Sequence, residues 1–300
     1  MGMPPPESGY AFPGLENLKS DIYPTISASS NPALRQPDKV VLITGAGRGC
    51  GRAMALQYVH AGVAAIFLVA RTASQLDEVE SSIKSINSST RVYKHSVDVT
   101  SEDAVSSLAS TVKEKEGGRL DILINNAGGG DPWTLITETT PKDYWSTFEV
   151  NVKGPYLFLH AFLPLLLETA EKYKIGTNVI NVASIGAVSV RPTASSYMIS
   201  KLAVQRLAEF VNAEYGDKGV VAVGIHPGGI ETELSKDVPA LKGLLNDTVD
   251  LPGGFVVWLT ATPRTWLAGR YVSATWDVEK LESMKDEIVS GDKLKVKMVV

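Results

Sequence analysis

The chain has 300 residues, of which 44% are hydrophobic and 21% charged, with a formal net charge of −4 at pH 7. This composition is typical of a globular protein that buries a substantial core as one large domain or two small ones. The net charge argues against nucleic acid and anionic membranes as partners and favours a small molecule. Because Cys50 is the single cysteine and no metal-type spacing accompanies the four histidines, we expect neither an intramolecular disulfide nor a metal site.

The first 37 residues are rich in Pro, Ser and Asn and show neither helical nor strand periodicity. We expect residues 1–37 to form an extended arm that either packs on the surface or stays mobile. The N-terminus lacks the basic start and apolar block of a signal peptide, and no apolar stretch approaches the roughly 20 residues needed to cross a bilayer. The sequence therefore predicts a cytoplasmic protein that does not enter a membrane.

From Val40 onward, short apolar runs bounded by Gly, Pro or polar turns alternate with longer segments of helical spacing. Strands separated by helices favour an α/β fold, a Rossmann-type doubly wound parallel sheet in three αβα layers, as a single domain over 38–275. Ligands of such a sheet bind outside the carboxyl ends of the strands. The seven predicted strands are residues 40–45, 64–70, 91–99, 120–128, 177–184, 220–228 and 269–274.

Residues 276–300 form a predicted C-terminal extension. Apolar Val278, Leu281, Met284 and Ile288 have the spacing of a short amphipathic helix. Residues 293–300 alternate Lys with Leu, Val and Met, which predicts a half-buried strand. We expect a structural role for this extension, such as a subunit contact.

The first strand runs into "TGAGRGCG", Thr44 to Gly51, and a helix-like segment follows. Glycines 45, 49 and 51 permit a tight turn, close approach of a pyrophosphate and close packing of helix on strand. The free N–H groups at the helix start attract the anion. A glycine-rich turn without a ligand is the alternative, but the position between a strand and a helix favours a nucleotide site.

The spacing Thr-Gly-x-x-x-Gly-x-Gly resembles the cofactor loop of the short-chain dehydrogenase/reductase family, and the resemblance covers roughly residues 38–275. Cys50 stands where family members commonly carry a larger aliphatic residue, so it is either a small packing residue or a redox-sensitive thiol. With both terminal extensions, the chain looks like fungal members. The resemblance implies that the cofactor is bound by Thr44, Gly45, Arg48, Gly49, Cys50 and Gly51.

Arg71 lies about 20 residues beyond the loop, where an acidic residue would bind a ribose hydroxyl and an arginine would bind a 2′-phosphate. Arg48 can offer a second guanidinium to that phosphate, and Ala70 leaves no carboxylate to repel it. We therefore predict a preference for NADP(H) over NAD(H). The alternative makes both arginines ordinary surface charges.

The resemblance also implies contacts with the adenosine half of the cofactor. Asp98, followed by Val99, is similar to the family aspartate that meets the adenine amino group. In "NNAG", residues Asn126, Ala127 and Gly128 resemble the stretch that stabilises the sheet and flanks the adenine ribose.

After the sixth strand, Pro227, Gly228, Ile230 and Thr232 resemble the family segment that caps the nicotinamide and bonds its carboxamide. Proline fixes the turn and glycine admits the ring. We assign the preceding His226 to packing rather than to catalysis.

Tyr197 and Lys201, in "SSYMISK", lie one helical turn apart, and Ser184 ends the preceding strand. All three are therefore expected at the same edge of the sheet. A phenol with a pKa near 10 is a weak base near neutral pH, and the Lys201 ammonium together with an oxidised nicotinamide ring would lower that pKa. The alternative is a structural pair on a wet helical face.

In the family picture, Tyr197 is the general acid or base, Ser184 hydrogen-bonds the carbonyl or alkoxide, and Lys201 also holds the nicotinamide ribose. Asn151 matches the asparagine on a long helix whose local distortion anchors a water leading to the lysine. The resemblance therefore implies an NADP(H)-dependent oxidoreductase that interconverts a ketone or aldehyde and an alcohol. Alternatives are a catalytically idle cofactor-binding scaffold or regulator, and an epimerase or dehydratase of the longer family branch.

The substrate side carries the least information, because family members share cofactor chemistry while their substrate loops diverge. An amphipathic helix is predicted beyond Thr232, either as a lid over an apolar carbonyl or alcohol substrate or as cover for the core. The family usually forms dimers or tetramers through helices that correspond to 141–167 and 193–216, so we expect a homodimer or homotetramer. The lid residues are Leu234, Val238, Leu241, Leu244 and Leu245, and the expected pocket walls are Gly130, Asp131, Trp133 and residues 185–190.

Overall fold

The structure is a computed structural model that describes residues 11–12, 14–232, 235–236, 238 and 241–298. It contains one parallel sheet of seven strands in the order β3-β2-β1-β4-β5-β6-β7. All seven predicted strands are confirmed, and the strand order reverses between β1 and β4, beside the glycine loop. The strands are β1 (Val40–Thr44), β2 (Ala65–Ala70), β3 (Arg91–Ser96), β4 (Ile122–Asn125), β5 (Thr177–Val182), β6 (Val220–His226) and β7 (Tyr271–Ser273).

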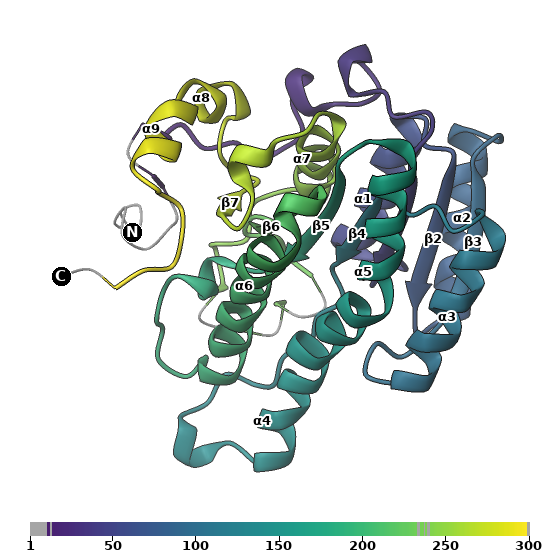
Figure 1. Cartoon of the computed structure of the whole chain (residues 1–300). Coiled ribbons are helices and arrows are strands. Elements are labelled where there is room, and N and C mark those ends of the chain that lie inside the picture. Colours follow the sequence, from purple (N-terminus) through teal and green to yellow (C-terminus); the bar gives the residue numbers. More distant parts are fainter. Residues whose placement is uncertain (1–10, 13, 233–234, 237, 239–240, 299–300) are drawn as a thin grey trace.

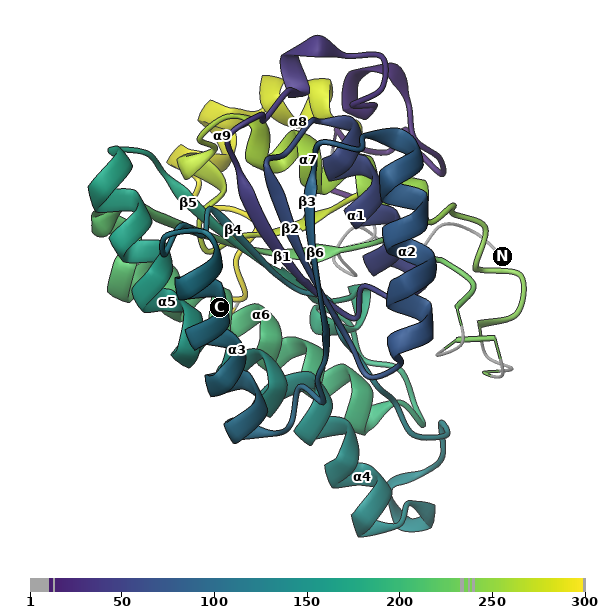
Figure 2. The same cartoon turned by 90° about the vertical axis from the view of Figure 1, so that its right-hand side faces the viewer.

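Helices cover both faces of the sheet (Figure 1). One face carries α1 (Gly49–His60), α2 (Ala73–Ile86) and α7 (Asp250–Ala261), and the other carries α3 (Glu102–Lys115), α5 (Gly154–Tyr173) and α6 (Ser195–Tyr215). Figure 2 shows the sheet between α1 and α2 on one side and α3, α5 and α6 on the other. Because both faces are covered, successive residues of a strand are apolar: Val41 and Ile43 pack in one layer, Val40 and Leu42 in the other. Single 3₁₀ turns occupy Pro24–Ile26, Pro32–Leu34, Ile136–Glu138, Ile185–Ala187, Gly216–Lys218 and Thr265–Leu267.

A long helical segment precedes β5. Helix α4 (Pro141–Phe148) continues through a π-helical turn, Glu149–Lys153, into α5. By length and composition, Pro141–Tyr173 is apolar enough to span a bilayer, which corrects the expectation that no stretch approaches this requirement. Half of the most apolar 18-residue stretch of this segment is buried within the protein. The core helix of a soluble protein can be equally long and apolar. This property alone therefore does not indicate a membrane span.

The N-terminal arm packs on the α7 side of the fold. Leu15, Ile26 and Leu34 are buried in the same core cluster as the α7 residues. The Tyr23 hydroxyl accepts a hydrogen bond of 2.9 Å from the backbone N–H of Val278. The sequence left open whether the arm packs on the surface or stays mobile. The described part of the arm is packed against the fold.

The C-terminal extension differs from its prediction. In place of one amphipathic helix, it forms α8 (Val278–Ser283) and α9 (Lys285–Ser290), separated at Met284, and the four predicted apolar residues all join the core. Residues 293–298 are not a strand, so that prediction is wrong for the described part of 293–300. The Leu294 carbonyl accepts one bond from the β7 residue Tyr271, whereas the Val296 carbonyl accepts from the side chain of Arg206. The tail thus leaves the edge of the sheet before a ladder can form.

Candidate active site

The glycine loop connects β1 to α1 at the carboxyl edge of the sheet. Gly45 and Gly49 have φ angles of 65° and 54°, in the left-handed region that favours glycine. A Cβ on Gly51 would lie 2.2 Å from the Gly45 carbonyl oxygen, so glycine is required for this approach of helix to strand. Glycines 45, 49 and 51 therefore each have a physical reason, in backbone conformation or in close packing, and a Cβ on Gly49 would meet no atom nearer than 4.0 Å.

Thr44 joins this loop to the "NNAG" segment after β4. Its hydroxyl oxygen accepts hydrogen bonds from the backbone N–H groups of Asn126 and Ala127, at 2.9 and 3.0 Å. The Asn126 side chain donates to the Thr44 carbonyl oxygen at 2.9 Å. The two motifs therefore form one rigid floor at the point where the strand order reverses.

The two predicted phosphate ligands lie at the same edge. Arg71 is exposed directly after β2, and Arg48 is the exposed N-cap residue of α1, where its side chain makes no capping bond. Hydrogen bonds from the backbone N–H and hydroxyl of Thr100 lower the pKa of Asp98, with a smaller contribution from the charge of Arg71. Asp98 therefore lies within electrostatic range of Arg71.

Val99 is buried, unlike its exposed neighbour Asp98. A Cβ on Gly154 would lie 3.0 Å from Val99 Cγ2, so Val99 packs closely on the first residue of α5. This contact fixes the end of the β3 loop against the helical layer.

Cys50 lies in the first turn of α1 and is half-buried. Burial raises the pKa of its thiol to about 11, although the charge of Lys201 opposes this rise. Near neutral pH the reactive thiolate is therefore scarce, which favours packing over redox chemistry for this residue.

Ser184, Tyr197 and Lys201 come together beyond the carboxyl end of β5. Lys201 Nζ lies 5.7 Å from the centre of the Tyr197 ring, one turn away on α6. Ser184 is buried, and its hydroxyl lies close enough to the phenol to lower the pKa of Tyr197. A Cβ on Gly128 would lie 3.5 Å from Lys201 Nζ, so the trio adjoins the "NNAG" segment. The structure thus places the three predicted catalytic residues at one point.

Burial has the largest effect on the pKa values of Tyr197 and Lys201. It raises the pKa of Tyr197 above its usual value and lowers that of Lys201 to about 8, because loss of hydration disfavours the charged forms. The sequence predicted that Lys201 and an oxidised cofactor together lower the phenol pKa. Lys201 alone does not produce this lowering. Near neutral pH, Tyr197 therefore keeps its proton while Lys201 is mostly charged.

Asn151 lies in the π-helical turn, which is the helix distortion expected at this position. Its side chain accepts from the Gly129 N–H at 2.8 Å and donates to the Gly129 carbonyl at 2.9 Å. It also donates to the Ser200 hydroxyl at 3.0 Å, and Ser200 donates to the Tyr197 carbonyl at 2.7 Å. Sequence reasoning did not single out Ser200, although its place between Tyr197 and Lys201 was a usable signal.

The Pro227-Gly228 turn follows β6. Gly228 has a φ of 112°, and a Cβ there would lie 2.8 Å from Asp247 Oδ2. The Gly229 N–H donates to the Asp247 carboxylate at 2.6 Å, so this aspartate fixes the turn. Sequence reasoning missed Asp247 because the pairing spans 18 residues and no local motif marks it.

The segment after this turn lies near the glycine loop. Ile230 is buried. A Cβ on Gly49, the first residue of α1, would lie 4.0 Å from Thr232 Cγ2. Among the described residues of 231–249, Leu241 has a 3₁₀ conformation and the others lie in turns or irregular backbone, so the predicted amphipathic helix is wrong for them. Gly243 is left-handed, with a φ of 78°, and Leu244 is 44% exposed. Leu234 lies outside the described residues.

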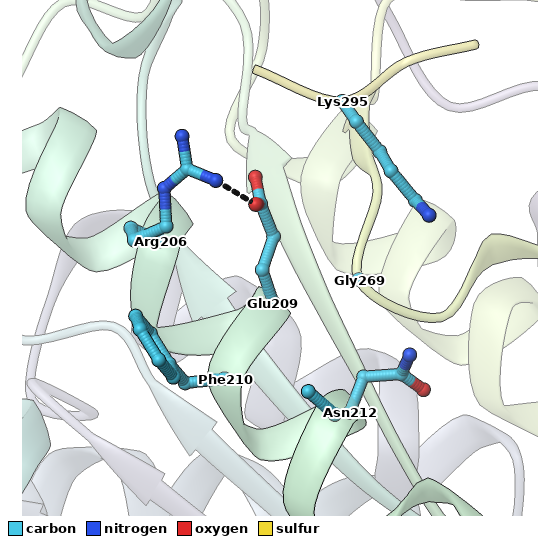
Figure 3. Close-up of a pocket in the computed structure, with 7 residues that line it drawn as sticks. Arg206, Glu209, Phe210, Asn212, Gly269 and Lys295 are labelled. Carbon is cyan, nitrogen blue, oxygen red and sulfur yellow. Dashed lines mark hydrogen bonds and ion pairs between the residues drawn. The ribbon is translucent and has the colours of Figure 1, made fainter. Parts of the chain in front are cut away.

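A separate pocket of about 320 Å³ lies on the α6 surface (Figure 3). Arg206 and Glu209 form an ion pair at this pocket, and Lys295 is paired with Asp292 at 2.7 Å. None of the predicted site residues contributes to it, so we do not assign it to the reaction. It is lined by Arg206, Glu209, Phe210, Asn212, Ala213, Gly269 and Lys295.

Known proteins resemble this chain in sequence and fold. The short chain dehydrogenase family profile matches residues 39–242. The short chain dehydrogenase mpl6 of Monascus purpureus is 43% identical over 302 aligned residues, which cover 99% of each chain. A 3-ketoacyl-(acyl-carrier-protein) reductase from Brucella melitensis complexed with NADH has a TM-score of 0.71 at 25% identity, over 80% of this chain and 97% of that chain. An alcohol dehydrogenase from Thermococcus sibiricus complexed with 5-hydroxy-NADP has a TM-score of 0.68 at 26% identity, over 78% and 95%. The chain belongs to the short-chain dehydrogenase/reductase family of oxidoreductases and is similar to its fungal members.

Proposed function

We propose that the protein is an NADP(H)-dependent oxidoreductase that interconverts a ketone or aldehyde and an alcohol. The observation that carries this proposal is the meeting of Ser184, Tyr197 and Lys201 at the carboxyl edge of the sheet. A hydroxyl, a protonated phenol and an ammonium at one point suit proton transfer to or from a substrate oxygen.

The residues around the strand-order reversal fit a dinucleotide cofactor. Gly45, Gly49 and Gly51 keep Cβ atoms away from the start of α1, whose N–H groups attract a pyrophosphate. Arg48 and Arg71 provide two exposed guanidinium groups for a 2′-phosphate, and they support the preference for NADP(H). We propose that the adenosine half lies along Asp98, Val99, Asn126, Ala127 and Gly128, and the nicotinamide end along Pro227, Gly228, Ile230 and Thr232.

The cofactor, when bound, supplies the hydride for reduction. Tyr197 donates its proton to the substrate carbonyl oxygen, since its raised pKa keeps the phenol protonated near neutral pH. The Ser184 hydroxyl donates a hydrogen bond to the same oxygen as negative charge develops there. Lys201 places a positive charge beside the phenolate that remains, and Asn151 holds the surrounding backbone in register.

We propose an apolar carbonyl or alcohol of moderate size as substrate. Ile136 and Val190, on loops that follow β4 and β5, are 68% and 99% exposed, so apolar side chains are available on these loops.

We further propose a cytoplasmic homodimer or homotetramer. Exposed apolar side chains on the helices expected at the subunit contact support it: Trp145, Tyr156, Ile199, Leu202 and Phe210.

A screen of ketones and aldehydes of graded size, followed by the loss of NADPH absorbance, tests this function directly. The proposal predicts turnover of at least one apolar carbonyl compound, with NADPH preferred to NADH. Cofactor binding without turnover of any carbonyl or alcohol would instead support an idle scaffold.

A further inference from the structure

The start of α6, which carries Tyr197, is not held by a cap of its own. The N-cap residue Ala194 makes no side-chain capping bond. Thr193, one residue earlier, has a φ of 71°, a left-handed conformation that is strained for a β-branched residue. The first turn of α6, which carries the phenol, therefore has no side-chain cap of its own to support it.

Asp131, in the loop after β4, supplies this support. The Ser196 hydroxyl, next to Tyr197, donates to Asp131 Oδ1, and the Thr147 hydroxyl of α4 donates to the same oxygen at 3.2 Å. Ser196 and Thr147 are only 4% and 2% exposed and Asp131 is half-buried, so these bonds are partly shielded from water. The carboxylate also lies at the positive end of the α6 dipole.

The loop that carries Asp131 is fixed at its other end as well. Gly129, two residues earlier, exchanges two hydrogen bonds with Asn151. Asn151 in turn reaches the backbone of Tyr197 through the Ser200 hydroxyl. The loop therefore holds α6 at two successive turns, through Asp131 and through Asn151.

We propose that Asp131 is a positioning residue for the reaction, which acts through Ser196 to hold the Tyr197 phenol toward Ser184. The sequence alone suggested a pocket wall at this position. The inference deepens the proposed function and rests on it. If the first turn of α6 is released, the phenol moves relative to the reacting oxygen, and a displacement of about 1 Å lowers a rate by about a hundredfold.

The test compares Asp131→Ala, Asp131→Asn and Asp143→Ala in the full chain. Asp143 is the matched control, because it accepts a hydroxyl bond from Thr140 at 2.7 Å on the exposed start of α4. Titration with NADPH counts the folded sites in each variant. We expect Asp131→Ala to lower kcat per site by about tenfold to a hundredfold, with the Kd for NADPH changed by less than about twofold. Asp131→Asn keeps most of kcat, because its amide oxygen still accepts from both hydroxyls.

A second measurement does not depend on turnover. Hydrogen exchange of the peptide that covers residues 194–201 is expected to be faster in Asp131→Ala than in Asp131→Asn or Asp143→Ala. Unchanged exchange, an unchanged kcat per site, or an asparagine variant as impaired as the alanine variant overturns the positioning role. Wild-type protein that binds NADPH but reduces no carbonyl compound overturns the proposed function instead, and the exchange result still decides whether Asp131 holds α6.

Discussion

Lys201 Nζ donates a hydrogen bond of 2.8 Å to the carbonyl oxygen of Val182, the last residue of β5. The bond fixes the amine at the carboxyl edge of the sheet, because Val182 lies only two residues before Ser184. Burial lowers the pKa of Lys201 to about 8, so the charge of this amine changes within an accessible pH range although its position is fixed by the hydrogen bond. This combination gives the proposed reaction a predictable pH dependence.

For reduction, kcat/KM is expected to fall as the pH rises through about 8. Lys201 loses its proton there, whereas the raised pKa of Tyr197 keeps the phenol protonated. Because kcat/KM reports the ionisation of the free enzyme, a profile from about pH 6 to about pH 10 measures this step. In Lys201→Arg, the guanidinium stays charged and the residual activity loses the decline near pH 8. A decline that persists in the arginine variant would assign it to another group.

Replacing Arg71 with Ala is expected to weaken the preference for NADPH over NADH. Loss of one charge-assisted contact with a 2′-phosphate lowers kcat/KM for NADPH by about tenfold or more and leaves that for NADH nearly unchanged. Arg91→Ala is the control, because Arg91 begins β3 at the opposite, amino edge of the sheet, where it pairs with Glu116 at 2.7 Å. An unaltered ratio of the two kcat/KM values in Arg71→Ala would mean that Arg71 does not read the phosphate.

His226 is expected to make the fold sensitive to acid. It is buried, its Nδ1 has no partner among the described residues, and burial lowers its pKa from 6.5 to about 4. Between these two pH values the unfolded chain binds the proton and the folded one does not, so stability falls as the pH falls. The full effect is about 3 kcal/mol. Urea unfolding across this range should show a shallower pH dependence in His226→Gln, and equal slopes would exclude this origin.

The sequence was sufficient to predict the strands and the place of the motif residues in the fold, for a common physical reason. Strands covered on both faces are continuous apolar runs, as in Val40–Thr44, and a Tyr and a Lys four residues apart share one helical face. Both signals are local. The conformational roles of Gly45, Gly49 and Gly51 could likewise be predicted, because glycine permits a left-handed turn and close packing of helix on strand.

What could not be predicted depends on contacts between distant segments. The Asp131–Ser196 bond spans 65 residues, and the Asp247–Gly229 bond spans 18. The pKa of Tyr197 could not be predicted because the degree of burial is set by the whole fold. The 293–298 segment has strand periodicity, but a strand also needs a partner edge, which one bond from Tyr271 to Leu294 does not provide.

The packing of the N-terminal arm leads to a prediction for stability. Ile26 has no exposed surface and lies in the main core cluster, so Ile26→Ala should lower the free energy of unfolding by about 2–5 kcal/mol. Ile136→Ala, at a side chain that is 68% exposed, should change it by less than about 0.5 kcal/mol. Equal, small effects of both substitutions on urea unfolding would show that the arm does not contribute to the folded core.

The most direct measurement is the turnover of Tyr197→Phe with a carbonyl substrate and NADPH. Without the phenolic proton, kcat is expected to fall by about 10²–10⁴-fold, while the Kd for NADPH stays within about twofold of the wild-type value. Tyr215→Phe, at the other end of α6, should retain wild-type kcat and controls for the loss of a tyrosine hydroxyl from this helix. A Tyr197→Phe protein that keeps most of kcat would contradict the assignment of this phenol as the general acid.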